Sequence, residues 1–155
     1  MTPKFMLDTN ICIYLMKHRP PEVAQRFAQC FIGDVVISAI TLAELEHGVA
    51  GSGAAAATNR RALDDFLEEV PVAAFEREAA RAYGPARLAT GERKRDALDK
   101  LIASHALALD VILVTNNLSD FTGYPGLRLE NWVAGVAPGA PPMSPWCSGT
   151  GRSWG

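Results

Sequence analysis

The chain is poor in cysteine, and the arrangement of the cysteines it has argues against two classes of small protein. Only Cys12, Cys30 and Cys147 occur among 155 residues. Their number is odd and their spacing is not that of zinc ligands. A chain of this size also does not need disulfide bonds to be stable. A disulfide scaffold and a zinc finger are therefore disfavoured, and a reducing compartment, the cytoplasm, is expected.

Long hydrophobic runs are also missing. No uninterrupted apolar stretch approaches the ~20 residues of a membrane-spanning helix. Near the N-terminus, a few apolar residues lead directly to Asp8, too soon for the apolar region of a signal peptide. We therefore expect a soluble protein that does not enter a membrane.

The chain has little excess charge of either sign. Its formal net charge is −2 and its isoelectric point is about 5.9. Overall charge therefore supplies no attraction to nucleic acid, and any such contact must come from a local basic face.

Composition divides the chain into one domain and a tail. Hydrophobic residues make up 48% of the sequence, and a chain of this length buries roughly two-thirds of its unfolded surface. We expect one domain over residues 1–132. Residues 133–155 are rich in Gly, Pro and Ser, with hardly any charge and no periodic apolar residues, so we expect a disordered tail with Trp146 and Trp154 as its only anchors.

Short apolar runs alternate with longer amphipathic ones up to Trp132, and this alternation is typical of an α/β protein with a mostly parallel central sheet flanked by helices. Strands are predicted at 4–7, 35–38, 111–114 and near 127–130. Helices are predicted at Thr9–Lys17, Pro21–Phe31, Thr41–Val49, Asn59–Val70, Glu76–Thr90 and Asp99–Leu109.

Three acidic residues follow strands or begin helices in this pattern: Asp8, Glu44 and Asp99. Ligands of open α/β sheets bind beyond the carboxyl ends of the strands, so these side chains are expected to share one pocket. Two carboxylates about 4 Å apart repel each other by roughly 4 kcal/mol. Gathering three of them requires protonation or a cation, and Mg²⁺ or Mn²⁺ prefers such oxygen ligands.

Each acid also has a local structural explanation. Asp8 or Thr9 could be a helix N-cap. Thr41 and Glu44 have the spacing of a capping box. Asp99 could equally cap its helix, and Asp96 could replace it as the functional acid. Taken singly, these residues leave both interpretations open.

Four ordered blocks together resemble a known family, the PIN-domain toxins called VapC. The likeness runs from Phe5 to Trp132, and each block contains one of the polar positions discussed here. The blocks are Leu7-Asp8-Thr9-Asn10, Ile37 to Leu45 followed by Gly48, Asp99 to Leu107, and Leu113 to Asn117 followed by Phe121.

The resemblance implies a PIN-like three-layer fold and a Mg²⁺- or Mn²⁺-dependent endoribonuclease. It also implies the toxin half of a type II toxin–antitoxin pair, inhibited by a VapB-type antitoxin that lies over the early helices. Structured RNAs such as transfer RNA are the implied substrates. We also expect a homodimer.

The resemblance places the metal-binding acids at Asp8, Glu44 and Asp99. Asn117 falls where many members have a fourth acid, and an amide offers only a neutral oxygen, so the nearby Asp120 could contribute instead. Thr9, Asn10 and Thr115 could support the site through hydrogen bonds, or could simply form turns and caps. Basic residues that could contact RNA are Arg87, Arg93, Lys94 and Arg95.

Two other functions compete with the nuclease. A phosphatase of the haloacid dehalogenase type also has an aspartate after its first strand and uses Mg²⁺, but its general acid would fall at Asn10, which cannot perform that role. A receiver-like or catalytically inert PIN-like module would bind metal only to organise an interface. We expect His105 to be a core residue and His18 to be on the surface.

Overall fold

The computed structural model describes residues 2–91 and 96–133 of the chain. Five short strands form one sheet in the order β3-β2-β1-β4-β5. All four neighbouring pairs are parallel, so the sheet is more uniform than the mostly parallel one predicted. The strands are β1 (Phe5–Leu7), β2 (Val35–Ser38), β3 (Val72–Ala73), β4 (Ile112–Val114) and β5 (Leu129–Glu130).

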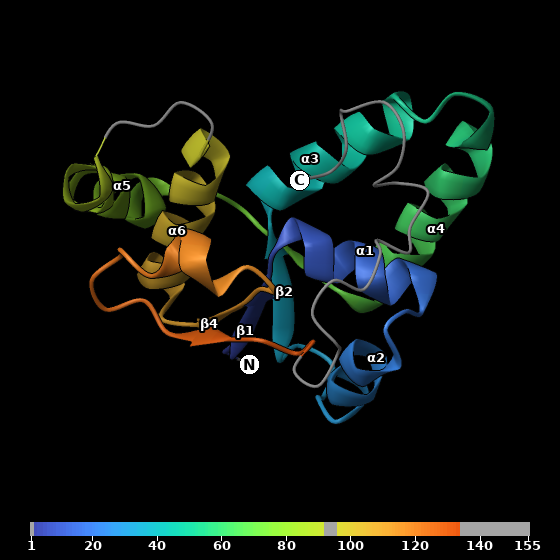
Figure 1. Cartoon of the computed structure of the whole chain (residues 1–155), viewed down its shortest axis with the longest axis horizontal. Helices are drawn as coiled ribbons and strands as arrows, with labels where there is room; N and C mark the ends of the chain where they lie inside the picture. Colours follow the sequence, from blue (N-terminus) through green and yellow to red (C-terminus); the bar gives the residue numbers. More distant parts are fainter. Residues whose placement is uncertain (1, 92–95, 134–155) are drawn as a thin grey trace.

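Helices cover both faces of this sheet and give the three layers predicted from the family resemblance (Figure 1). Four lie on one side: α1 (Thr9–Lys17), α2 (Pro21–Ala28), α3 (Ala39–Ala50) and α4 (Ala56–Glu69). On the other side are α5 (Arg77–Thr90) and α6 (Ala97–Leu109). Two short 3₁₀ helices, η1 (Gly53–Ala55) and η3 (Leu118–Phe121), complete the described elements.

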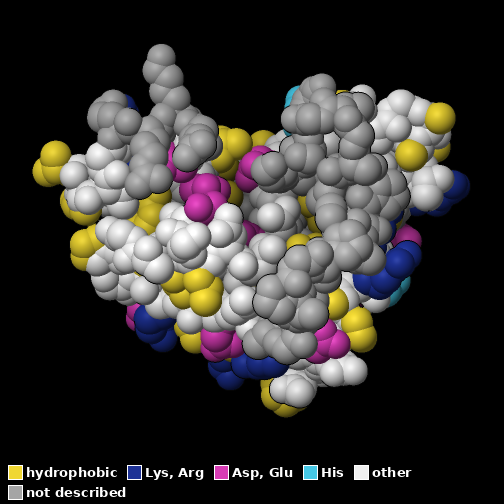
Figure 2. Space-filling model, in the orientation of Figure 1, with side chains coloured by type: hydrophobic (Ala, Val, Ile, Leu, Met, Phe, Trp, Pro, Cys, Tyr) yellow, Lys and Arg dark blue, Asp and Glu magenta, His cyan; other side chains and the backbone are white. Residues whose placement is uncertain are grey.

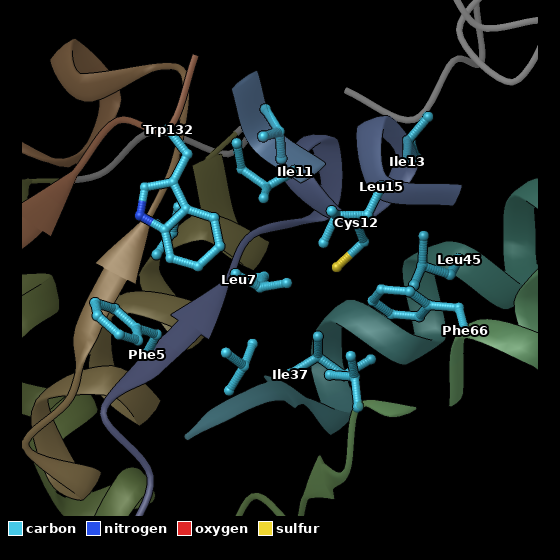
Figure 3. Packing of buried hydrophobic residues seen from close by; sticks show 14 of the residues in the cluster. Phe5, Leu7, Ile11, Cys12, Ile13, Leu15, Ile37, Leu45, Phe66 and Trp132 are labelled. Carbon is cyan, nitrogen blue, oxygen red and sulfur yellow. The ribbon is translucent and has the colours of Figure 1, made fainter. Parts of the chain in front are cut away.

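Alternating side chains of the central strands build two cores. Phe5 and Leu7 pack with α1, α3 and α4 (Figure 3), whereas Met6 packs with α5 and α6. Val36 likewise joins the second core, although its neighbours Val35 and Ile37 join the first. Successive side chains in a strand point to opposite faces, and a strand covered on both faces is apolar throughout. The short continuous apolar runs in the sequence therefore predict these strands well.

Helix α3 begins two residues earlier than predicted, and this changes the interpretation of Glu44. The N-cap is Ser38, whose Oγ accepts a hydrogen bond from the Ile40 N–H at 3.0 Å. Thr41 is therefore inside the helix and Glu44 is in its second turn, so the capping box proposed for this pair is wrong. Similarly, Asp96 and not Asp99 occupies the N-cap position of α6.

The C-terminal strand is tied to the N-terminal one through Trp132. Its ring meets Phe5 edge-on with centroids 5.4 Å apart, and the Arg26 guanidinium lies 5.2 Å from the Trp132 ring. Glu130 accepts a hydrogen bond from Trp132 Nε1 at 2.8 Å and pairs with Arg26 at 3.3 Å. Trp132 is thus an integral part of the core.

The tail predicted for residues 133–155, with Trp146 and Trp154, lies outside the described residues except for Val133. Within residues 2–91 and 96–133, no helix has both the length and the apolar character needed to cross a membrane.

Candidate active site

The order in which the chain adds strands to the sheet reverses at β1. After β1 the chain adds β2 and β3 on one side, and it then returns to place β4 and β5 on the other side. In open parallel sheets, ligands bind at such a switch point, beyond the carboxyl ends of the strands. Asp8 follows β1 and Thr115 follows β4 at this edge, and the Asp8 N–H donates to the Val114 carbonyl at 2.9 Å.

A cavity of about 160 Å³ opens here. Figure 2 shows acidic side chains gathered in the hollow between the α6 side and the α3 side of the molecule. The polar residues that line the cavity are Asp8, Thr9, Asn10, Glu44, Asp99, Asn117 and Asp120. The fold therefore brings the three predicted acids together, although as many as 91 positions separate them in the sequence.

Asp8 is both a helix cap and a cavity carboxylate. It is 7% exposed, and its Oδ1 accepts a hydrogen bond from the Ile11 N–H at 3.1 Å. Burial raises the pKa of Asp8 to about 6, against hydrogen bonds from Thr115 and Ile11 that lower it, and the negative charge of Glu44 raises it further. The two local interpretations of Asp8 are therefore compatible.

Glu44 reaches the cavity from the second turn of α3. The hydroxyl of Thr9 on α1 donates to Glu44 Oε1 at 2.7 Å, which fixes the carboxylate across two helices. Burial raises the pKa of Glu44, and the Thr9 hydrogen bond partly offsets that rise. The supporting role predicted for Thr9 has this concrete contact.

Asp99 is the third residue of α6 and is half-buried. Burial is the main reason that the pKa of Asp99 rises to about 7, and repulsion from Glu44, Asp120, Asp8 and Asp96 adds to it. Carboxylates that raise one another's pKa in this way share one electrostatic site.

Asn117 and Asp120 form the outer wall of the cavity. Asn117 Nδ2 donates to Asp120 Oδ2, and the Asn117 amide oxygen accepts from Ser119 Oγ at 3.2 Å. The amide oxygen of Asn117 and one carboxylate oxygen of Asp120 are therefore engaged, and the negative charge of this pair belongs to Asp120. Thr115 is buried; it hydrogen-bonds Asp8 and accepts the Asn117 N–H at 3.0 Å.

Among the basic residues predicted to contact RNA, only Arg87 is described by the structure, and it does not line the cavity. Arg87 is exposed on α5, with its guanidinium 6.0 Å from the Tyr83 ring, and Arg93, Lys94 and Arg95 lie outside the described residues. His105 is buried and His18 is exposed, so both of these predictions are confirmed.

Sequence reasoning missed the apolar part of the cavity. Leu98, Ile102 and Phe121 line it together with the acids. Ile102 lies one helical turn after Asp99, so this spacing could have predicted that the two side chains share one face of the helix. These side chains limit the access of water to Asp99 and so help to raise its pKa.

The donor set suits a hard divalent cation, because every polar side chain in the cavity offers oxygen and carboxylates predominate. In the described part of the chain, no three acidic, histidine or cysteine side chains already converge closely enough to hold one ion. Ionised carboxylates repel one another at close range, and a cation between them offsets that repulsion. The residues fit the metal chemically, and its binding would draw their carboxylates closer.

An all-parallel α/β sheet with a carboxylate cavity at its switch point defines a class of metal-dependent enzyme, and comparison with known proteins gives the family. The sequence pattern of the PIN domain matches residues 5–124. The chain is 38% identical over 131 residues to a tRNA(fMet)-specific endonuclease VapC of Shigella flexneri, covering 83% of this chain and 98% of that protein. It is 39% identical over 132 residues to Ribonuclease VapC2 of Haemophilus influenzae, covering 84% and 98%.

A solved structure shows the same likeness in three dimensions. The DNA-bound VapBC of Salmonella typhimurium aligns with a TM-score of 0.74 and 34% identity, covering 84% of this chain and 99% of that one. The chain therefore belongs to the PIN-domain family, within its VapC ribonucleases. This membership favours the nuclease over the phosphatase and the inert module.

Proposed function

We propose that this protein is the toxin of a type II toxin–antitoxin pair and hydrolyses phosphodiester bonds of RNA with a bound Mg²⁺, for which Mn²⁺ can substitute. The observation that carries the proposal is the acidic cavity at the switch point of the sheet in a VapC-type chain. Asp8, Glu44 and Asp99 come from three different elements and line this one cavity.

The roles of the residues follow from their contacts. Asp8, Glu44 and Asp99 would hold the metal, which would supply positive charge on the phosphoryl group and a more acidic water. Thr115 orients Asp8, and Thr9 orients Glu44. Asp120 supplies the outer negative charge and Asn117 fixes it in place. Asn10, at the rim, is placed to donate a hydrogen bond to a phosphate oxygen.

The substrate and the partners are proposed from the relatives. A relative in Shigella flexneri is named as specific for tRNA(fMet), so initiator transfer RNA is the first RNA to test. A VapB-type antitoxin is the proposed inhibitor, because structural neighbours are VapBC complexes. An RNA substrate implies action in the cytoplasm. Homodimerisation and RNA contacts by Arg87, Arg93, Lys94 and Arg95 complete the proposal.

Cleavage of labelled initiator transfer RNA tests the activity. We expect products with Mg²⁺ or Mn²⁺, and none with EDTA or with the Asp99→Asn variant. Elongator methionine transfer RNA is the matched substrate control. Cleavage that persists in EDTA would refute the metal mechanism, and hydrolysis of p-nitrophenyl phosphate without cleavage of RNA would favour the phosphatase.

A further inference from the structure

A buried polar contact joins the helices that carry Glu44 and Asp99. Ser38 and His105 are 0% and 1% exposed, and Ser38 Oγ lies 2.8 Å from His105 Nδ1. Ser38 caps α3, which carries Glu44, and His105 is on α6, which carries Asp99. This bond therefore connects directly the helices that supply two of the three acids.

The other hydrogen bond of Ser38 indicates which group donates and which accepts in its contact with His105. Ser38 Oγ already accepts the Ile40 N–H at 3.0 Å, so its own hydrogen is free to donate to Nδ1. Burial lowers the pKa of His105, which keeps the ring neutral and Nδ1 available as an acceptor. Phe75 meets the ring edge-on at 5.3 Å and restricts its rotation. In this arrangement the Ser38 hydroxyl both accepts and donates, and the ring hydrogen of His105 is on Nε2, which is buried and has no hydrogen-bond partner among the described residues.

We propose that His105 is a positioning residue which, through Ser38, sets the spacing of α3 and α6 and hence the separation of the Glu44 and Asp99 carboxylates. The inference rests on the proposed function. When the carboxylates are ionised, their repulsion acts to separate the two helices, and the buried bond between those helices opposes it. Because Mg²⁺ requires near-ideal octahedral geometry, a small change in this spacing should weaken its binding.

Four variants test the inference. His105→Leu removes the acceptor, His105→Asn keeps an oxygen acceptor near the position of Nδ1, Ser38→Ala removes the donor, and the fourth variant combines Ser38→Ala with His105→Leu. Titration with Mn²⁺, the melting temperature in EDTA, and KM and kcat for RNA are measured for each. His47→Leu, at an exposed position on α3 three residues after Glu44, is the control.

We expect His105→Leu to bind Mn²⁺ about tenfold more weakly, the lower end of the loss seen when a direct hydrogen bond to a metal ligand is removed, because this bond acts on the helices and not on the ligands. His105→Asn should recover most of the affinity. At limiting metal, kcat should fall while KM for RNA stays constant. In the Ser38→Ala background, His105→Leu should cause no further loss, because the bond is already absent.

Several results would overturn the inference. A folded His105→Leu variant with unchanged affinity would do so, as would equal losses in the Leu and Asn variants or additive losses in the double variant. If His105→Leu fails to fold, Ser38→Ala decides, since it leaves the ring in place. A wild-type protein that neither binds Mn²⁺ nor cleaves RNA would instead refute the proposed function itself. The cleavage assay that compares the wild type with Asp99→Asn distinguishes this outcome from a failure of the inference about His105.

Discussion

Asp8, Glu44 and Asp99 are held in a cavity that favours their neutral forms when no metal is present. The pKa of Asp8 is raised to about 6 and that of Asp99 to about 7, and that of Glu44 is also raised. The cavity therefore costs stability in the metal-free protein. A site that is unfavourable without its ligand is typical of function rather than of packing.

Neutral replacements of the acids should separate activity from stability. We expect Asp8→Asn, Glu44→Gln and Asp99→Asn each to abolish RNA cleavage and to leave the metal-free protein as stable as the wild type or more stable. Asn can still cap α1 at position 8, and Gln can still accept from Thr9. Unfolding by urea in EDTA at pH 8 measures the effect. A clear loss of stability in all three variants would assign the acids a structural role.

The pH dependence of stability follows from the same pKa shifts. Because the folded-state pKa values of Asp8 and Asp99 lie above the ordinary value of 3.8, the folded protein binds more protons than the unfolded chain between pH 4 and 7. The free energy of unfolding of the metal-free protein should therefore fall as the pH rises through this range, by about 3 kcal/mol from Asp8 alone. Urea unfolding from pH 4 to 8 in EDTA checks the slope.

Asp8→Asn is the matched control for this profile, and its curve should be flatter than that of the wild type. Saturating Mn²⁺ should restore stability at high pH, since a cation favours the charged carboxylates. A wild-type stability that rises from pH 4 to 7 in EDTA would show that these groups are ionised at ordinary pKa values.

Asn117 tests how many metal ions the site holds. Because Asn117 is an amide where the family resemblance implies a fourth acid, we expect one well-occupied Mn²⁺ site and at most a weak second one. Asn117→Asp should tighten binding of Mn²⁺, although it loses the hydrogen bond to Asp120 and places two like charges together. Calorimetric titration of Mn²⁺ measures both proteins, with Thr122→Ala, just after η3 and not among the residues that line the cavity, as the control. Two equally tight sites in the wild type would show that Asp120 already completes the set.

At the scale of the elements, the sequence predicted most of the fold because buried parallel strands and amphipathic helices have strong local patterns. Helix α1 has the predicted bounds Thr9–Lys17. Strand β3 was missed because it has only two residues, Val72 and Ala73, and it exists through its pairing with β2. Its hydrogen bonds depend on the neighbouring strand, and the local sequence does not reveal which strand lies beside it.

The start of helix α3 is another feature that the local sequence alone does not predict. The sequence predicted that α3 begins at Thr41, whereas Ser38, the last residue of β2, is its N-cap. The acids of the site were predicted because they are charged residues in apolar surroundings. The Ser38–His105 bond was not predicted, since its partners are 67 positions apart and each has an ordinary local role.

At the scale of the whole molecule, the parallel sheet explains why one cavity collects residues from distant parts of the chain. Strands β1, β2 and β4 all point to the same edge, so the segments that follow them converge there. Residues that share no sequence neighbourhood can then act on one ion. The family resemblance was informative because its four blocks correspond to these converging segments.

Val133 is half-buried against the first core, so the folded domain extends one residue past the predicted end at Trp132. We propose that residues 134–155 do not contribute to its stability. Trp132 is 4% exposed and packs on Phe5 and Arg26, whereas the composition beyond it cannot offset its ordering entropy by burial. Deleting 134–155 should leave the melting temperature and RNA cleavage nearly unchanged. Trp132→Ala in the full chain should cost about 3–5 kcal/mol.

Trp146→Ala is the control for the loss of a tryptophan within the tail. Thermal unfolding of the full chain, the truncated chain and both substituted chains, each with and without Mn²⁺, decides the boundary. A large fall in melting temperature on deleting 134–155, reproduced by Trp146→Ala or Trp154→Ala, would show that the tail docks on the domain through an aromatic anchor. The boundary would then move beyond Val133.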